Sequence, residues 1–258
     1  CSLERHHRVL TAAANDGLLL WEALRRVPEG LAAALTDNEA AREALLRYAS
    51  MIDESDQPLI AVQTGRGLPS PQEADGWFAC HSFDHIIARE PWRRGFGDSG
   101  AAEAFSAFAA AARLLLADHG DVVLLQSPPK SGERVSRILS SEGKADPVIK
   151  ALAEAEEAFF QDAGSDRWTW DAETLEHSFA GAGFKIVLNA LEQSEERLLS
   201  ERDLALWFNP ERSSWGKFMR EKLGDQDFRS LSAMLREKAR QGPVVWKWKS
   251  LLLKGVAG

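Results

Sequence analysis

Residues 9–17, Val9-Leu10-Thr11-Ala12-Ala13-Ala14-Asn15-Asp16-Gly17, decide the fold class that this sequence predicts. The run 8–11 is typical of a short buried strand, and a turn of small residues follows it. Leu20, Leu24 and Val27 then recur at helical spacing, until Pro28-Glu29-Gly30 ends the pattern. A strand that passes through a tight turn into a helix is the repeating unit of a parallel sheet with crossover helices.

The same alternation continues along the chain. A loop rich in Gly, Pro and Ser at 65–76 and a turn at 118–121 separate elements of this pattern. We therefore predict an α/β fold: a seven-stranded, mostly parallel sheet with helices on both faces and a helical insertion before the last strand. The further strands are expected at 31–35, 59–62, 83–88, 122–126, 184–188 and 244–253, and the helices around 45–52, 101–117, 147–159, 171–183, 200–207, 214–223 and 225–240.

Length and composition indicate one packed domain. The 258 residues are 45% hydrophobic, so we predict a single domain over 1–258, with halves at 1–145 and 146–258 and a helical extension at 200–241. The apolar stretch 104–117 contains Ser106 and Arg113 and is shorter than the roughly 20 residues that cross a bilayer. No membrane span is expected.

The two cysteines and the first residues bear on the cellular setting. Cys1 and Cys80 show no metal-ligand spacing and form no disulfide framework, so the expected compartment is a reducing cytoplasm. No secretory signal opens the chain. Because the chain begins at Cys1 rather than Met and reaches a strand within about eight residues, we expect it to be a piece of a longer polypeptide.

The formal net charge of −8 is unevenly distributed. Residues 212–258 hold 11 Lys and Arg against 4 Asp and Glu, whereas residues 1–211 hold 20 against 35. Such a basic segment can mark a surface for DNA or a protein partner, because phosphate contacts supply most non-specific affinity for nucleic acid. A solvated helical face that happens to be basic is the other interpretation.

With the turn after the first strand placed, the chain resembles class I S-adenosylmethionine-dependent methyltransferases from Arg8 to about Leu191. In that family the first strand ends in an acidic residue and enters a Gly-x-Gly-x-Gly loop. Here Thr11 replaces the acid, Ala13 and Asn15 replace the first two glycines, and Gly17 is the third. The resemblance implies S-adenosylmethionine as cofactor, these four residues beside it, and 1–145 as the cofactor-binding half. A Cβ at position 13 narrows the space for the ligand, while Asn tolerates left-handed backbone.

Asp37, with its neighbour Asn38, is the candidate for the second cofactor contact. It follows Gly17 by 20 residues, near the spacing of a carboxylate that accepts hydrogen bonds from ribose hydroxyls. Asp37 or its neighbour Asn38 could instead cap the following helix. Phe83-Asp84, Gly120 and Ala182-Gly183-Phe184 also fall where turns of this fold fall.

The end of the fourth strand offers candidate substrate contacts. Amino-methyltransferases carry Asn-Pro-Pro and an aromatic residue there, and this chain has Arg89-Glu90-Pro91-Trp92. The asparagine that would orient a target amino group is absent, so no catalytic residue is assigned. We expect Arg89 on the cofactor side and Glu90 and Trp92 on the substrate side of the site mouth. The other interpretation is a surface Glu-Arg pair with an aromatic residue packed on the sheet edge.

The histidines give no metal site in the sequence. The pairs His6-His7 and His81/His85 lack a Cys, Asp or Glu at ligand spacing, so structural or solvent-exposed roles are expected.

A second resemblance concerns the C-terminal part. The order Leu206-Trp207-Phe208, Ser214-Trp215-Gly216 and Val244-Val245-Trp246 is similar to an extension of bacterial proteins that fuse a RarA-type recombination-factor AAA+ ATPase to a methyltransferase-like domain. Segments 3–10 and 21–28 also look like the beginning of that domain. The resemblance implies an AAA+ ATPase module in the same polypeptide and a role in DNA recombination. The chain has no P-loop motif, so any ATPase activity would belong to that module.

Two functions therefore stand side by side. One is methyl transfer from S-adenosylmethionine, which depends on positioning more than on acid–base groups. The other is a catalytically inactive interaction or nucleic-acid-docking module that keeps the fold.

Overall fold

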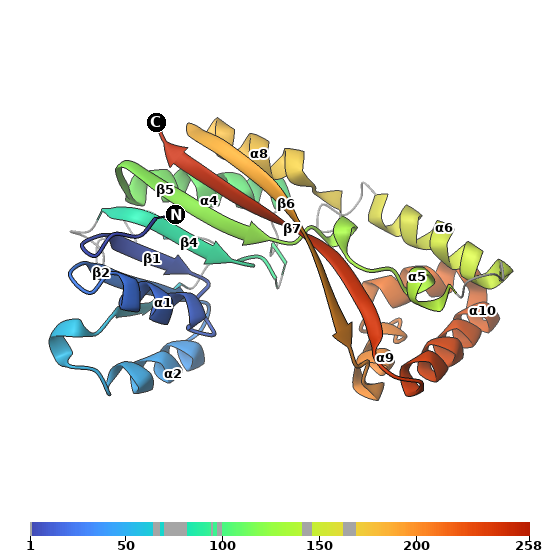
Figure 1. The fold of residues 1–258 in the computed structure, drawn as a ribbon. Helices are drawn as coiled ribbons and strands as arrows, with labels where there is room; N and C mark the ends of the chain where they lie inside the picture. The colour runs from blue at the N-terminus through green and yellow to red at the C-terminus, as the bar shows by residue number, and fades with distance from the viewer. Residues whose placement is uncertain are drawn as a thin grey trace. The chain divides into compact units, whose positions relative to one another are not determined.

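The computed structural model describes residues 2–63, 68–69, 82–93, 95–96, 100–140, 146–161 and 169–258 (Figure 1). The chain forms two compact units. Unit 1 comprises Cys1–Gln126, Trp170–Leu191 and Leu251–Gly258, and unit 2 comprises Ser127–Thr169 and Glu192–Ser250. The single domain with a boundary after residue 145 stays a prediction. Cys1, Cys80, His81 and all of the predicted loop 65–76 except residues 68–69 lie outside the described residues.

A seven-stranded sheet forms the centre of unit 1, and its strand order is β3-β2-β1-β4-β5-β7-β6. Strands β3, β2, β1, β4 and β5 pair in parallel, and β7 pairs antiparallel with β5. The predicted mostly parallel sheet is thereby confirmed. The strands are β1 (Arg8–Ala12), β2 (Leu31–Thr36), β3 (Leu59–Val62), β4 (Phe83–Arg89), β5 (Leu116–Gln126), β6 (Phe184–Arg197) and β7 (Val244–Ala257).

Helices cover both faces of this sheet, as the sequence predicts (Figure 1). Neighbouring residues of a strand point to opposite faces, so Val9 and Leu10 belong to two separate apolar clusters. Helices α1 (Leu18–Arg26) and α2 (Glu39–Ala49) pack on the Val9 face. Helices α4 (Ala101–Leu115) and α8 (Ala172–Gly181) pack on the Leu10 face, and the short helix η1 (Glu54–Asp56) precedes β3.

The junction of α4 and β5 differs from the sequence prediction. Helix α4 ends at Leu115 rather than at 117, and the predicted turn 118–121 lies inside β5. Leu116 pairs with Phe83, and the next pair is Asp121 with His85, so the strand bulges between them. A Cβ on Gly120 would lie 3.0 Å from two carbonyl oxygens, so a side chain there would crowd the bulge. Residues 118–121 do depart from regular structure, but they form a bulge within β5 and not a turn between two elements.

Unit 2 is mainly helical. It contains η2 (Pro129–Ser131), α5 (Val135–Leu139), α6 (Pro147–Gln161), α9 (Glu201–Trp207) and α10 (Ser214–Arg240). A capping box of Ser200 and Asp203 begins α9. Gly224 is non-helical, with φ of 81°, and separates the two helices predicted at 214–223 and 225–240.

Strands β6 and β7 are longer than predicted, at 14 residues each. The distal part of β6 is mostly exposed and polar, so hydrophobic alternation does not reveal it. In β7, Lys254 and Gly255 interrupt the apolar run. The structure continues the strand through Gly255, which pairs with Val122 of β5. A Cβ there would lie 3.0 Å from Val122 and 3.2 Å from Phe184, so glycine suits this close packing.

Candidate functional site

The loop after β1 keeps a glycine-like backbone although it holds a single glycine. Ala13 has φ of 53° and Gly17 has φ of 71°, both in the left-handed region. This conformation costs a residue with a Cβ about 1–2 kcal/mol. The amide of Ala14 donates a 2.8 Å hydrogen bond to the carbonyl of Leu35, which ties the loop to the end of β2. Position 13 thus has a backbone conformation that favours glycine, although an alanine occupies it.

Gly17 and Thr11 are buried and contribute to packing in the protein interior. A Cβ on Gly17 would lie 2.6 Å from Leu45 Cδ2 and 2.7 Å from Trp21 Nε1, so packing against α1 and α2 requires glycine there. Thr11 is fully buried, and its hydroxyl donates to the carbonyl of Ala33 at 3.0 Å. The Thr11 side chain is therefore used within the sheet.

Asn15 and Asp37 lie together where β1 and β2 end. Asn15 Nδ2 donates to Asp37 Oδ2 at 2.6 Å, and the Asp37 amide donates to Asn15 Oδ1 at 2.9 Å. Asn38 is the N-cap of α2 and accepts a hydrogen bond from the amide of Ala41 at 3.0 Å. The capping alternative thus applies to Asn38. Asp37 remains exposed at the sheet edge, held by Asn15, and its contact with a ribose stays a prediction.

Arg89, the last residue of β4, points toward the same loop. Its NH2 lies 3.4 Å from Asp16 Oδ2, and both side chains are about half exposed, at 47% and 55%. The pair places one positive group beside residues 13–17. Arg89, Asp16, Asn15 and Asp37 therefore form a polar rim at the carboxyl ends of β1, β2 and β4.

Glu90 and Trp92 follow β4 in different environments. Glu90 has left-handed backbone, with φ of 51°, and its Oε2 accepts a hydrogen bond from Gln126 Nε2 at 2.9 Å. Trp92 is 3% exposed, and its ring centroid lies 4.6 Å from that of Phe105. The ring of Trp92 is therefore part of the core rather than of an open surface. Substrate contacts by these two residues stay predictions.

Two comparisons by sequence give no match: no family model fits the chain, and no curated protein matches it. Comparison of structures gives YcgJ from Bacillus subtilis, with a TM-score of 0.52 and 15% identity, covering 99% of this chain and 94% of that protein. A proposed methyltransferase from Bacillus halodurans C-125 has a TM-score of 0.52 and 12% identity, with the same coverage. This chain has the Rossmann-like methyltransferase fold.

In this methyltransferase fold, the polar rim lies where open α/β sheets bind ligands, outside the carboxyl ends of the strands. The structure brings together Ala13, Asn15, Asp37 and Arg89 there, whereas Thr11 and Trp92 are buried. None of the helices in the described ranges is both long and apolar enough to cross a membrane.

A second cluster of titratable side chains in unit 1 has no signal in the sequence. His85 Nδ1 lies 2.6 Å from Asp121 Oδ1, His85 Nε2 lies 2.8 Å from His7 Nδ1, and Lys254 Nζ lies 3.0 Å from Asp121 Oδ2. Burial raises the pKa of Asp121, but the hydrogen bonds and charges of His85 and Lys254 outweigh burial and lower the pKa overall. Local spacing cannot show this cluster, because its members are at least 36 residues apart.

Glu4, His6 and His7 also approach one another near the start of β1. Their possible ligand atoms lie within 4.8 Å. However, His7 Nδ1 already accepts a hydrogen bond from the amide of Glu4 at 3.0 Å and contacts His85. We therefore assign His7 to the hydrogen-bonded cluster, whereas His6 is exposed and lies 4.0 Å from Glu4.

Proposed function

We propose that unit 1 is a methyltransferase-type domain that binds S-adenosylmethionine at the polar rim. One observation carries the proposal: the exposed carboxylate of Asp37, fixed by Asn15 directly after β2, stands beside a loop whose Ala13 has glycine-like backbone. A carboxylate in this place suits the two adjacent hydroxyls of a ribose.

The residues present fit parts of this cofactor. Asp37 would accept hydrogen bonds from the ribose, and Arg89, held by Asp16, would attract the carboxylate of the amino-acid part. The cofactor, when bound, supplies a methyl group on a positively charged sulfur. Transfer depends chiefly on in-line positioning of an acceptor, so a site without a catalytic acid or base is sufficient. Glu90 lies where an acceptor would approach the carboxyl end of β4.

Calorimetry with S-adenosylmethionine and S-adenosylhomocysteine tests the cofactor. Asp37→Asn should weaken binding about tenfold or more, because it removes a charged acceptor of ribose hydroxyls. Asp53→Asn, an equally exposed carboxylate after α2, is the matched control and should leave affinity unchanged. An absence of heat at millimolar ligand, or equal affinity in the Asp37 variant, would remove the proposal.

A second candidate is a domain that keeps the site but has lost turnover. The hydroxyl of Thr11 is bound within the sheet where the family has an acid, and Ala13 adds a Cβ to the loop. Ala13→Gly tests whether the Cβ at position 13 narrows the site. Tighter cofactor binding in this variant supports a site narrowed by the Cβ, whereas unchanged binding supports a site already open to the cofactor.

The finer proposal for this candidate is docking to DNA or to an AAA+ ATPase module of the recombination type in the same polypeptide. It rests on the residue order of the C-terminal segments and on the basic segment 212–258. Six of the eleven basic residues in that segment form ion pairs with acidic side chains, which reduces the charge available to phosphates.

A further inference from the structure

Unit 2 contains a pocket of about 470 Å³, a volume within the range of small-molecule sites. Residues from η2, α5, α6, α9, α10 and β7 contribute to it or flank it. Its walls are mainly apolar, and five aromatic side chains of unit 2 contribute to them: Phe159, Phe160, Trp207, Trp215 and Trp246.

The aromatic walls come from segments that the sequence analysis singled out and the sheet does not use. Trp207, Trp215 and Trp246 belong to the three motifs at 206–208, 214–216 and 244–246. Their rings are only half buried, and the ring centroids of Trp207 and Trp246 lie 5.6 Å apart. Large aromatic surfaces left partly open around a cavity are typical of a ligand site.

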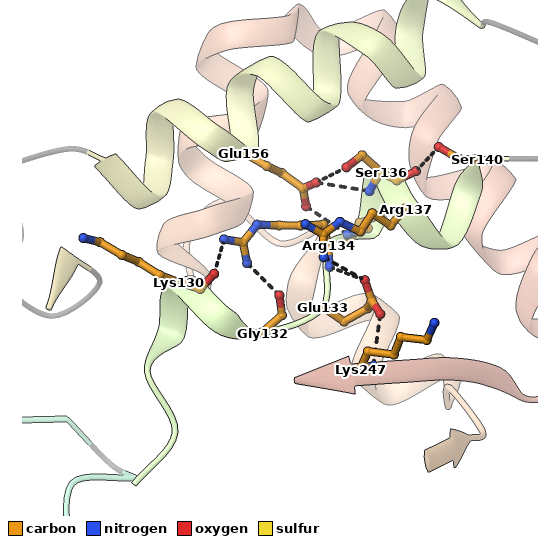
Figure 2. A network of polar contacts seen from close by, with 10 residues as sticks. Lys130, Gly132, Glu133, Arg134, Ser136, Arg137, Ser140, Glu156 and Lys247 are labelled. Carbon is orange, nitrogen blue, oxygen red and sulfur yellow. Dashed lines mark hydrogen bonds and ion pairs between the residues drawn. The ribbon is translucent and has the colours of Figure 1, made fainter. Parts of the chain in front are cut away.

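The two carboxylates in the wall are already satisfied by the protein (Figure 2). Glu156 accepts hydrogen bonds from the amides of Val135 and Ser136 and from the Ser136 hydroxyl, at 3.0, 3.1 and 2.6 Å. Burial raises the pKa of Glu156, although these hydrogen bonds oppose the rise. Glu133 accepts hydrogen bonds from the amides of Arg134 and Lys247, both at 3.0 Å. Neither carboxylate is poised to attract a cationic ligand.

Arginines already cover two of the aromatic faces. The guanidinium of Arg134, a residue 9% exposed, lies 3.7 Å above the ring of Phe160 and donates to the carbonyls of Gly132 and Lys130 (Figure 2). Arg197 lies 4.6 Å from the ring of Trp246. A cationic ligand would compete with these groups. Arg212 is different: it is exposed at the pocket and has no ion-pair partner among the described residues.

We propose that this pocket binds a flat aromatic carboxylate, with its ring against the tryptophans and its anionic group at Arg212. The charge balance favours this ligand class, because the carboxylates of the wall are occupied and one rim cation is free. The site lies within unit 2, and its existence does not depend on cofactor binding by unit 1.

Three probes of one shape test the ligand class: 1-naphthoate, 1-naphthalenemethanol and 1-naphthylmethylammonium, titrated by saturation-transfer NMR. Saturable binding should be tightest for the acid, weaker for the alcohol and weakest for the ammonium. Arg212→Gln should raise the Kd of the acid about fivefold and leave the alcohol unchanged. Lys217→Gln removes an exposed charge on α10 that does not line the pocket, and should change neither.

Ser214→Trp tests the location. Ser214 is exposed, lines the pocket and is the first residue of α10, so a large side chain can fill the cavity without disturbing the core. Loss of naphthoate binding in this variant, with unchanged far-UV circular dichroism, supports the site. Retained binding in Ser214→Trp, tighter binding of the ammonium, an equal Kd in Arg212→Gln, or no saturable binding by any probe would overturn the proposal.

Discussion

At the scale of single residues, the loop after β1 has a backbone conformation that its residue types do not favour. Ala13 carries a Cβ, yet its φ of 53° is one that favours glycine. The hydrogen bond from Ala14 to Leu35 and the pair of Asn15 with Asp37 hold the loop on both sides. Neighbouring contacts can therefore maintain a strained residue at a candidate site.

Ala13→Gly should leave the free energy of unfolding unchanged or raise it by up to about 1 kcal/mol, because relief of the left-handed strain offsets the chain entropy of glycine. Ala14→Gly, one position on and outside the left-handed region, should lose about 1 kcal/mol. Urea unfolding measures both variants. An equal loss in both would show that Ala13 carries no strain.

At the scale of elements, side chains from four parts of unit 1 meet in the cluster of His7, His85, Asp121 and Lys254. Residues of β4, β5 and β7 contribute, together with the residue before β1. The bulge in β5 sets this arrangement, because it brings Asp121 opposite His85. Removing one member of such a buried group is strongly destabilising, because it leaves the remaining buried charges without a partner.

Asp121→Asn should cost about 3 kcal/mol near neutral pH. The pKa of Asp121 is lowered in the folded chain, so its contribution is present above the ordinary value of 3.8 and is lost as the pH falls through the folded pKa. The unfolding free energy of the variant should consequently fall less steeply below about pH 4 than that of the wild type.

Asp118→Asn, an exposed position of the same strand, is the control and should keep the wild-type pH profile. Urea unfolding across the acid range measures all three proteins. Identical acid dependence in the wild type and the Asp121 variant would contradict a stabilising role for the cluster.

The break in α10 is a second feature of this scale. Gly224→Ala should cost about 1–2 kcal/mol, because φ of 81° is left-handed, even though a Cβ there would meet nothing within 4 Å. Gly181→Ala is the matched control: it is helical, equally open and outside the left-handed region, so it should be neutral or stabilising. Thermal unfolding compares them. Equal effects would mean that open space, and not backbone conformation, decides.

At the scale of the whole molecule, the basic segment 212–258 loses much of its apparent charge to ion pairs. Examples are Arg220 and Arg229 with Asp225, and Lys249 with Glu192. Lys217, Lys222 and Lys247 have no ion-pair partner among the described residues. Together with Arg212 and Lys238, which also lack an ion-pair partner among the described residues, these three lysines are the candidates for any contact with DNA phosphates.

The combined Lys217→Gln, Lys222→Gln and Lys247→Gln variant should reduce the slope of log affinity against log salt by about 3, since each phosphate contact contributes about 0.9. Neutralising the paired Arg220, Arg229 and Arg240 should change it less. Fluorescence anisotropy with a short duplex between about 50 and 200 mM salt measures the slope. The same slope in the wild type and the lysine variant would remove DNA docking by this segment.

Much of the fold could be predicted from the sequence, because its signals are local. Hydrophobic periodicity gives the alternation of strands and helices, and single residues set their ends: Asn38 and Asp171 as N-caps, Ser200 with Asp203, and Gly224 at the helix break. The polar far end of β6 could not be predicted, since an exposed strand shows no apolar pattern.

The candidate site could be predicted only in part. The sequence by itself placed Ala13, Asn15, Asp37 and Arg89 at the ends of the first, second and fourth strands, because chain order and the parallel sheet fix that edge. Only the tertiary structure decided that Trp92 is buried, that His85 meets Asp121, and that three tryptophan motifs enclose one pocket. Those contacts join residues far apart in the chain, so they depend on strand order, bulges and loop paths that no local pattern encodes.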